Sequence, residues 1–379
     1  ETFMCSGVWA QIDPKKTPSC ASLKFRKAFL NILTDKQAEE RKRDTDLTEA
    51  ETETGNRFPD NADRVACRTI WLNRIKQGMI KGGQLDPASL VAALDSTKDP
   101  DEIALIDAQY EDLLANIRIK IRQSIADGHK PMDNIIPMID MSPSMSGTPK
   151  QAAIGLGIMC SDLNLNEYGG LVITFDSDAH IVDLKQGKTF SEKVAIIKAL
   201  PIGCSTNFKL AMERMGEIII KHHISQDQIP RLAIFSDEQF DHGQFGYEST
   251  MEDQLETMFH DIGIQVSGIP YAKPGTVHWN LRGDTNGFAS TAHAPNVQMV
   301  QGYSAALFDL ILCGKPEATP YETMRRKLDS PRYDLVREAF NRARPSTVQI
   351  SVSCYEESET ETIKKTASWI DLSSDVESV

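Results

Sequence analysis

An acidic residue and two hydroxyl residues follow directly after an apolar run near the middle of the chain. The run extends from Ile135 to Ile139, and Asp140, Ser142 and Ser144 come after it on alternate positions. Alternate residues of an extended segment point to the same side, so these three oxygen-bearing side chains can face one ligand. The spacing therefore favours a binding site at the end of a strand.

Two later residues could complete this site. Thr206 lies in the loop GCSTN ahead of a predicted helix, and Asp237 follows the apolar run LAIFS. In an open sheet of parallel strands, ligands bind beyond the carboxyl ends of the strands, where the loops diverge. We therefore expect Thr206 and Asp237 to lie on the same rim of the sheet as Asp140, Ser142 and Ser144.

Two carboxylates and three hydroxyls are a donor set suited to a hard divalent cation. Mg²⁺ takes oxygen ligands at roughly 2.0–2.1 Å in octahedral geometry, and with one or two protein carboxylates it keeps several waters. A cation held by Asp140, Ser142, Ser144, Thr206 and Asp237 would keep a position open for an acidic group from a partner. The sequence predicts a site for Mg²⁺, with Mn²⁺ or Ca²⁺ as alternatives.

The elements that must position these residues alternate between strands and helices. Short β-rich runs occur at 134–140, 170–176, 179–184, 231–236, 276–280 and 297–301, and helical patterns at 149–164, 190–199, 207–223, 250–261 and 303–312. Several strands are continuous apolar runs, which is typical of parallel strands buried on both faces. The pattern predicts an α/β fold with a doubly wound, mostly parallel sheet, to which a hairpin at 171–184 adds an antiparallel edge.

The remaining sequence suggests a mainly helical N-terminal region over 1–130. Helical patterns span 62–81 and 99–128, and in the latter apolar residues from Ile103 to Ile125 recur at steps of three or four, as in a core-facing helix. We expect a charged, mobile loop near 45–60, a sheet domain over 131–315, C-terminal helices packing back over 316–345, and an acidic tail over 346–379.

Composition limits the classes of function. The 379 residues include 54 acids and 41 bases, and a net charge of −13 disfavours broad attraction to nucleic-acid phosphates. No apolar run is long enough to span a membrane, so we expect no membrane partner. The seven scattered cysteines favour neither a disulfide framework nor a zinc site, so we expect an intracellular, cytoplasmic protein. The chain begins at Glu1 rather than at methionine, as a processed or partial product would.

The motif Asp-x-Ser-x-Ser, followed by a loop Thr and by an Asp after a later strand, resembles the metal-ion-dependent adhesion site (MIDAS) of von Willebrand factor A domains. Here these residues are Asp140, Ser142, Ser144, Thr206 and Asp237. The resemblance implies that the first loop ligates the metal, with Thr206 and Asp237 binding directly or through water. Pro143 replaces the usual glycine between the serines and stiffens the loop.

Further segments resemble an uncharacterised, DUF2828-like family of plants, fungi and large DNA viruses. These segments are PGTVHWNLRGDT, VQGYSAALFDLIL, TPYETMRRKLDSPRYDLVREAF and SDEQFD. Members of that family join a helical N-terminal region to a C-terminal von Willebrand A-like domain. The resemblance covers most of the chain from about residue 8 to 341 and implies a fold rather than an activity.

Other interpretations of the same residues lead to different functions. Asp140 and its serines could cap a helix, since Ser and Asp often bond helix N-terminal amides. A strand ending in Asp also occurs in haloacid-dehalogenase-type phosphatases, but Ser142 stands where the second acid belongs. The segment ending Gly187-Lys188-Thr189 lacks the earlier glycine of a phosphate-binding loop. We therefore expect no catalytic residues and no enzyme.

The sequence favours a non-enzymatic module in which the metal at the MIDAS-type site accepts an exposed Asp or Glu of a protein partner. A second hypothesis is an RNA-binding scaffold, because a helical region joined to an A-like domain is similar to Ro-type proteins. A third is a structural role in a larger particle, including a virus particle, as the viral members of the resembled family suggest.

Overall fold

The computed structural model describes residues 2–43, 55–126, 134–164, 168–238, 251–282 and 296–304, together with 321, 324–325, 328–329 and 333–343. The chain divides into two compact units, Glu1–Thr319 and Pro320–Val379. The second unit contributes one described helix of some length, α15 (Asp334–Ala343). The predicted acidic tail at 346–379, most of the predicted helix at 303–312 and residues 45–54 of the predicted charged loop lie outside the described residues.

The described residues of the first unit form a six-stranded sheet with the order β3-β2-β1-β4-β5-β6. Its strands are β1 (Ile135–Asp140), β2 (Leu171–Phe175), β3 (Ala179–Asp183), β4 (Arg231–Ser236), β5 (Thr276–Asn280) and β6 (Val297–Gln301). All neighbouring strands are parallel except β2 and β3, which form the predicted antiparallel hairpin. The predicted α/β class and mostly parallel sheet are confirmed.

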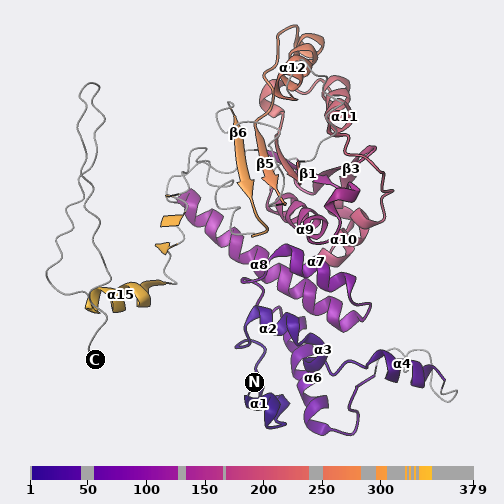
Figure 1. Ribbon diagram of the computed structural model, residues 1–379, viewed down its shortest axis with the longest axis vertical. Coiled ribbons are helices and arrows are strands. Elements are labelled where there is room, and N and C mark those ends of the chain that lie inside the picture. The colour runs from indigo at the N-terminus through magenta and orange to yellow at the C-terminus, as the bar shows by residue number, and fades with distance from the viewer. Residues whose placement is uncertain are drawn as a thin grey trace, which may run out of the picture. The chain divides into compact units, whose positions relative to one another are not determined.

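Helices cover both faces of this sheet (Figure 1). The helices of the sheet domain are α9 (Thr148–Leu163), α10 (Phe190–Lys198), α11 (Phe208–Lys221) and α12 (Met251–Ser267). The N-terminal region contains α1 (Thr2–Cys5), α2 (Ser19–Lys24), α3 (Arg26–Phe29), α4 (Asp35–Lys42), α6 (Ala62–Lys76), α7 (Pro87–Asp95) and α8 (Pro100–Ala126). Short 3₁₀ turns lie at η1 (Trp9–Gln11), η2 (Pro143–Met145), η3 (Leu184–Gln186) and η4 (Gln226–Gln228).

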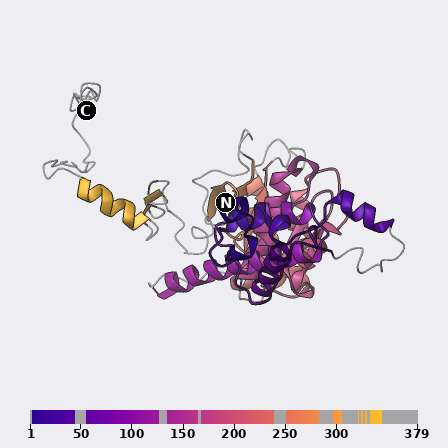
Figure 2. The ribbon, with the colours of Figure 1, turned by 90° about the horizontal axis from the view of Figure 1, so that it is seen from below.

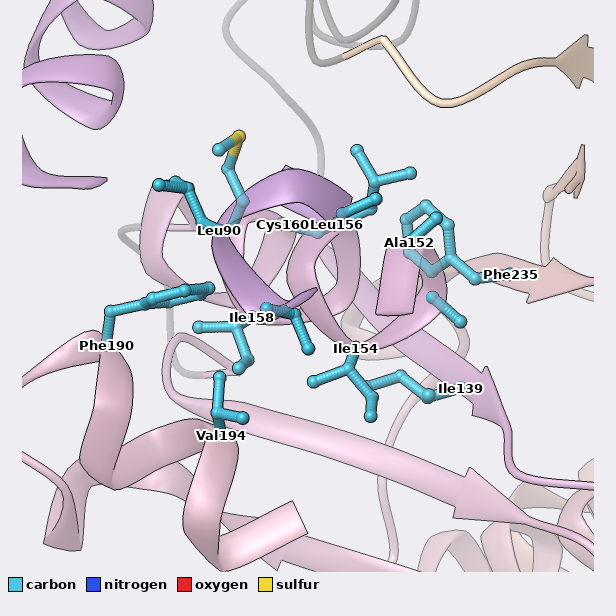
Figure 3. Packing of buried hydrophobic residues seen from close by; sticks show 14 of the residues in the cluster. Leu90, Ile139, Ala152, Ile154, Leu156, Ile158, Cys160, Phe190, Val194 and Phe235 are labelled. Carbon is cyan, nitrogen blue, oxygen red and sulfur yellow. The ribbon is translucent and has the colours of Figure 1, made fainter. Parts of the chain in front are cut away.

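One face of the sheet packs against α9 and α10, and these in turn contact α7 and α8. Figure 3 shows side chains of α9 lying between Leu90 of α7, Phe190 and Val194 of α10, and Ile139 and Phe235 of the strands. Helix α9 is buried on nearly its whole circumference, and most of its buried residues are apolar. Burial of this helix fixes the position of the loop that precedes it, which carries Ser142 and Ser144.

The N-terminal region touches α9 at one very close contact. A Cβ atom on Gly155 of α9 would lie 2.7 Å from Cβ and 2.8 Å from the carbonyl oxygen of Pro87. Pro87 occupies the first turn of α7, directly after the capping residue Asp86, whose side chain accepts a bond from Ser89 N–H. Only glycine allows the two helix backbones to approach this closely.

The opposite face of the sheet packs against α11 and α12. Strand residues Ile136 and Met138 point to this side, while Ile135 and Ile139 point to the α9 side. This alternation explains why β1 is apolar at every position before Asp140, since both of its faces are buried.

Two expectations for the N-terminal helices need correction. Helix α6 ends at Lys76 rather than near residue 81, because the chain turns at Gly78 with a φ of +65°. In α8, the predicted core stripe ends early: Ile117 is buried, but Ile125 is 43% exposed. The last turns of α8 extend beyond α7 in Figure 1, and the end of this helix projects from the rest of the first unit in Figure 2. Ile121 still packs partly against the core, whereas Ile125 in the last turn is exposed. Within the described residues, no helix is long and apolar enough to cross a membrane.

Candidate metal site

Asp140 and Asp237 lie at the place where the winding of the sheet reverses. From β1 the chain passes through α9 to β2 on one side, whereas β4 pairs with β1 on the other side. Loops leaving β1 and β4 therefore diverge, and in open α/β sheets such crevices are where ligands bind. Asp140 is the last residue of β1, and Asp237 directly follows β4.

Hydrogen bonds from β4 and from the loop after β1 hold the Asp140 carboxylate. Its Oδ1 atom accepts the Ser142 N–H at 2.9 Å, and its Oδ2 atom accepts the Ser236 hydroxyl at 2.5 Å. The same Ser236 hydroxyl accepts the N–H of Glu238 at 2.9 Å, which shapes the turn that carries Asp237. Both carboxylates, Asp140 and Asp237, are fully buried.

The two serines of the first loop are in contact with each other. The hydroxyl oxygens of Ser142 and Ser144 lie 2.9 Å apart. Pro143 between them begins the 3₁₀ turn η2, so its fixed φ suits the local backbone. The helix-capping interpretation is wrong for these residues: η2 takes no capping bond from the Ser142 side chain, and α9 begins after Gly147, which has no side chain to cap it.

The Asp140 carboxylate is buried close to a second carboxylate, that of Asp237. Burial, and to a smaller extent the nearby charge of Asp237, raise the pKa of Asp140 to about 6, although the hydrogen bonds from Ser236 and Ser142 oppose this shift. Like charges sharing a buried site are unfavourable unless a cation compensates them. The carboxylate and hydroxyl oxygens present match the ligands that Mg²⁺ takes in proteins, so the residues fit such an ion.

Thr206 lies in a loop that is tied to the end of β2, the strand on the other side of β1. Asp176, which follows β2, accepts the Gly203 N–H at 2.7 Å through Oδ2 and the Asn207 N–H at 2.7 Å through its carbonyl. Ser177 Oγ accepts the N–H groups of Cys204 and Ser205. These bonds bracket Thr206, which is buried, and place its loop beside the Asp140 end of β1.

Gly203 is required by this arrangement. A Cβ atom at position 203 would lie 2.3 Å from Oγ and 2.4 Å from Cβ of Ser177. Any side chain here would push the loop away from Ser177 and would displace Thr206 with it.

Two cationic side chains lie at the edge of the site. The Nζ atom of Lys150 donates to the Met141 carbonyl at 2.8 Å; burial lowers the pKa of this lysine, and the negative charges of Asp140 and Asp176 oppose that shift. The Nη1 atom of Arg282 donates to the Ser144 carbonyl at 3.0 Å and lies 3.6 Å from Oδ2 of Asp237. The metal-free carboxylates are thus partly balanced by basic groups of the chain itself.

Sequence reasoning did not identify four of these residues as part of the site. Asp176 had the same signal as Asp140, an acid directly after an apolar strand, and could have been found. Ser236 and Arg282 had no local signal, because they reach the site through contacts with residues 96 and 138 positions away. Lys150 reaches it through the Met141 carbonyl, nine positions away, but no motif singled it out.

The rim above the buried oxygens is open in part. Pro143, Ser146 and Cys204 are exposed, and the Arg282 side chain keeps 37% of its surface. Among the described residues, no group of three or more His, Cys, Asp or Glu side chains is placed to hold a metal. A cation here would depend on two carboxylates and on hydroxyls, which leaves positions for outside ligands.

A separate groove of about 540 Å³ lies where α7 meets the start of α9. Its lining includes Asp86, Thr148, Gln151 and Tyr303. Thr148 is the first residue of α9, so the groove and the loop carrying Ser144 adjoin the same helix end.

Comparisons with known proteins found a viral relative and a protein family. The chain is 27% identical over 317 residues to Uncharacterized protein L728 of Acanthamoeba polyphaga mimivirus. The match covers 82% of this chain and 49% of that relative, so the chain spans about half the length of the viral protein. The family described as Domain of unknown function (DUF7788) matches residues 134–349, a segment that begins just before β1. Because this match covers more than half of the chain, the protein belongs to the DUF7788 family.

Proposed function

We propose that this protein is a non-enzymatic binding module with a von Willebrand A-type MIDAS, in which Mg²⁺ accepts an acidic side chain from a protein partner. The observation that carries the proposal is the meeting of Asp140, Ser142 and Asp237 at the crevice between β1 and β4. Ser144 contacts Ser142, and the Thr206 loop is anchored beside the same strand end.

The charge balance supports an acidic ligand. Without metal, the site holds the carboxylates Asp140, Asp176 and Asp237 against the cations Lys150 and Arg282. The net charge of these five side chains is slightly negative, and a bound divalent cation would make the net charge of the site slightly positive. A carboxylate from outside would then restore neutrality in a setting where unpaired charge is costly.

The donor set also argues for binding rather than turnover. A bound Mg²⁺ would supply a Lewis-acidic point that orients an oxygen ligand. The chain's own residues hold the loops: Ser236 fixes Asp140, and Asp176 fixes the loop of Thr206. Among the described residues, the hydroxyl groups of Ser142 and Ser144 bond to each other, and no His or Lys that could act as a general base bonds to either of them.

The direct test is selection of a displayed random-peptide library on the immobilised full chain, in millimolar Mg²⁺ and in EDTA. We expect Mg²⁺-dependent enrichment of peptides containing Asp or Glu, which is lost in EDTA and with Asp140→Asn. Ser146→Ala is the matched control, because Ser146 is an exposed serine of the same loop outside the donor set. Enrichment that is equal with and without metal would reject the proposal.

A further inference from the structure

Lys150 lies where the carboxyl ends of β1 and β2 meet. It belongs to the first turn of α9, and its Nζ atom donates to the Met141 carbonyl at 2.8 Å. The N–H of the same Met141 donates to the Phe175 carbonyl at 2.9 Å. Asp140 precedes Met141 in the chain, and Asp176 follows Phe175. The hydrogen bonds therefore place the ammonium group of Lys150 between two acidic strand ends.

The fold fixes this position of Lys150. Helix α9 is buried on nearly its whole circumference, so its first turn cannot rotate away from the strand ends. The Lys150 side chain is half-buried, and the negative charges of Asp140 and Asp176 both act on it. Among the described residues, no carboxylate is in direct contact with its Nζ atom. The positive charge is thus shared between two acids and is not used up in one ion pair.

A divalent cation beside Asp140 would meet this ammonium group as a like charge. Two positive charges held close together in a partly buried site oppose each other. A carboxylate from outside has the opposite effect, because the metal and Lys150 both attract it. The lysine should therefore oppose binding of the metal alone and favour binding of the metal together with a carboxylate.

We propose that Lys150 is a counter-cation built into the site, which lowers the affinity for Mg²⁺ alone and makes Mg²⁺ and the partner's carboxylate bind cooperatively. This inference rests on the proposed function, since it requires a metal beside Asp140. It adds a regulation of the same site: the metal and the partner bind best together. Such coupling is reciprocal, so the carboxylate tightens metal binding by the same factor as the metal tightens carboxylate binding.

A purely structural role for Lys150 predicts the opposite change in metal affinity. If the lysine only held the Met141 carbonyl and the loop that follows it, loss of the lysine would loosen the loop and weaken metal binding. If its charge dominates, loss of that charge should tighten metal binding roughly tenfold, as one unit charge does at short range in a partly solvated site. This gain should shrink at high ionic strength, because salt screens partly exposed charges.

The experiment titrates Mn²⁺ into the full chain and measures binding by water-proton relaxation. Each titration is run in sodium acetate and in sodium chloride of equal ionic strength. Lys150→Met removes the charge and the donor, Lys150→Gln keeps a donor without the charge, and Lys150→Arg keeps both. Lys221→Met is the matched control, because it removes one positive charge from an exposed position. Lys221 ends the 14-residue helix α11, about 20 Å along the helix from the Thr206 loop.

We expect Lys150→Met and Lys150→Gln to bind Mn²⁺ roughly tenfold more tightly than wild type in chloride. Acetate should tighten Mn²⁺ binding less in these two variants than in wild type, whereas Lys150→Arg and Lys221→Met should behave as wild type. Unchanged or weaker Mn²⁺ binding in both uncharged variants would overturn the inference while leaving the proposed function standing. Failure of the wild-type chain to bind Mn²⁺ would instead overturn the proposed function, and the inference with it.

Discussion

The hydroxyl of Ser236 donates a hydrogen bond of 2.5 Å to Oδ2 of Asp140, and this bond joins the carboxyl ends of β4 and β1. The two residues are 96 positions apart in the chain. Both are fully buried, so neither can exchange this bond for one to water.

Ser236→Ala should therefore destabilise the metal-free protein by about 1–3 kcal/mol, because it leaves the Asp140 oxygen and the Glu238 N–H with a lost partner in a buried setting. Urea unfolding in EDTA measures the change. Ser146→Ala, which alters an exposed serine of the neighbouring loop, should stay within about 0.5 kcal/mol of wild type. Equal effects of both variants would show that the bond contributes nothing.

Asp140→Asn should have opposite effects with and without metal. Burial and Asp237 raise the pKa of Asp140 to about 6, so at neutral pH the folded protein holds an unfavourable charge, and the amide should stabilise the metal-free form. Protonated Asp140 contributes its full share to the free energy of unfolding below its unfolded pKa near 4. This contribution, up to about 3 kcal/mol, is lost as the pH rises through about 6.

Thermal unfolding in EDTA and in Mg²⁺ tests this prediction. Mg²⁺ at a hundredfold excess over its dissociation constant should stabilise wild type by about 2.7 kcal/mol and leave Asp140→Asn unaffected. Asp227→Asn, a change at an exposed acid, should behave as wild type in both conditions. A Mg²⁺ shift of the same size in Asp140→Asn would contradict the assignment.

His278 should make the fold sensitive to acid. Burial in β5, together with the positive charge of Lys273, lowers its pKa to about 4. The unfolded state, with a pKa near 6.5, then binds a proton that the folded state does not, so stability is full above pH 6.5 and falls as pH drops towards 4. The loss can reach about 3 kcal/mol.

Urea unfolding at pH 7.5 and pH 4.5 should show a larger acid loss in wild type than in His278→Gln. His222→Gln is the control, since His222 is exposed at the end of α11. The Glu238 carboxyl lies 3.7 Å from Nδ1 of His278, and an ionised Glu238 would favour the charged imidazole. If wild type instead resisted acid better than His278→Gln, His278 and Glu238 would form an ion pair, and this pair would outweigh the effect of burial on the His278 pKa.

Gly203→Ala should weaken metal binding without unfolding the protein. The added Cβ would collide with Ser177, which anchors the loop of Thr206 through Cys204 N–H and Ser205 N–H. Overpacking of this kind costs about 1–3 kcal/mol in a rigid core, but here the loop can shift to relieve the collision. We therefore expect a lower Mg²⁺ affinity with near-normal urea unfolding in EDTA. Calorimetric titration measures the affinity. Ile202→Ala, at a 56% exposed neighbour, should bind Mg²⁺ normally.

Gly155→Ala should destabilise the contact between α7 and α9. Alanine favours a helix over glycine by about 1 kcal/mol, but the new methyl would meet the Pro87 backbone at 2.8 Å, and that backbone cannot yield as a side chain can. We expect a net loss of about 1–3 kcal/mol in urea unfolding.

Gly216→Ala is the matched control in α11. Its added methyl would meet the Cδ1 atom of Ile262 at 2.8 Å, the flexible end of a side chain, so the helix preference should prevail and stability should hold or rise. If Gly155→Ala were also neutral, the close approach to Pro87 would not hold the N-terminal region to α9.

The described strands and helices of the sheet domain could be predicted from local pattern alone. The run from Ile135 to Ile139 is apolar on both faces, as buried parallel strands are, and the observed β1 covers these residues and Asp140. Asp140, Ser142 and Ser144 could be singled out because an acid and hydroxyls at a strand end are conspicuous against such a run. Their spacing in the chain is short, so their proximity is a local property.

The remaining features depended on the tertiary structure, because they join residues that are distant in the chain. Arg282 meets Ser144 across 138 residues only because β5 and β1 lie on either side of β4, and no periodicity encodes strand order. Likewise, the apolar stripe of α8 shows which side of the helix avoids water but not whether a neighbour covers Ile125. Local sequence determines the type of each element through its periodicity, whereas strand order and burial follow from the packing of the whole chain.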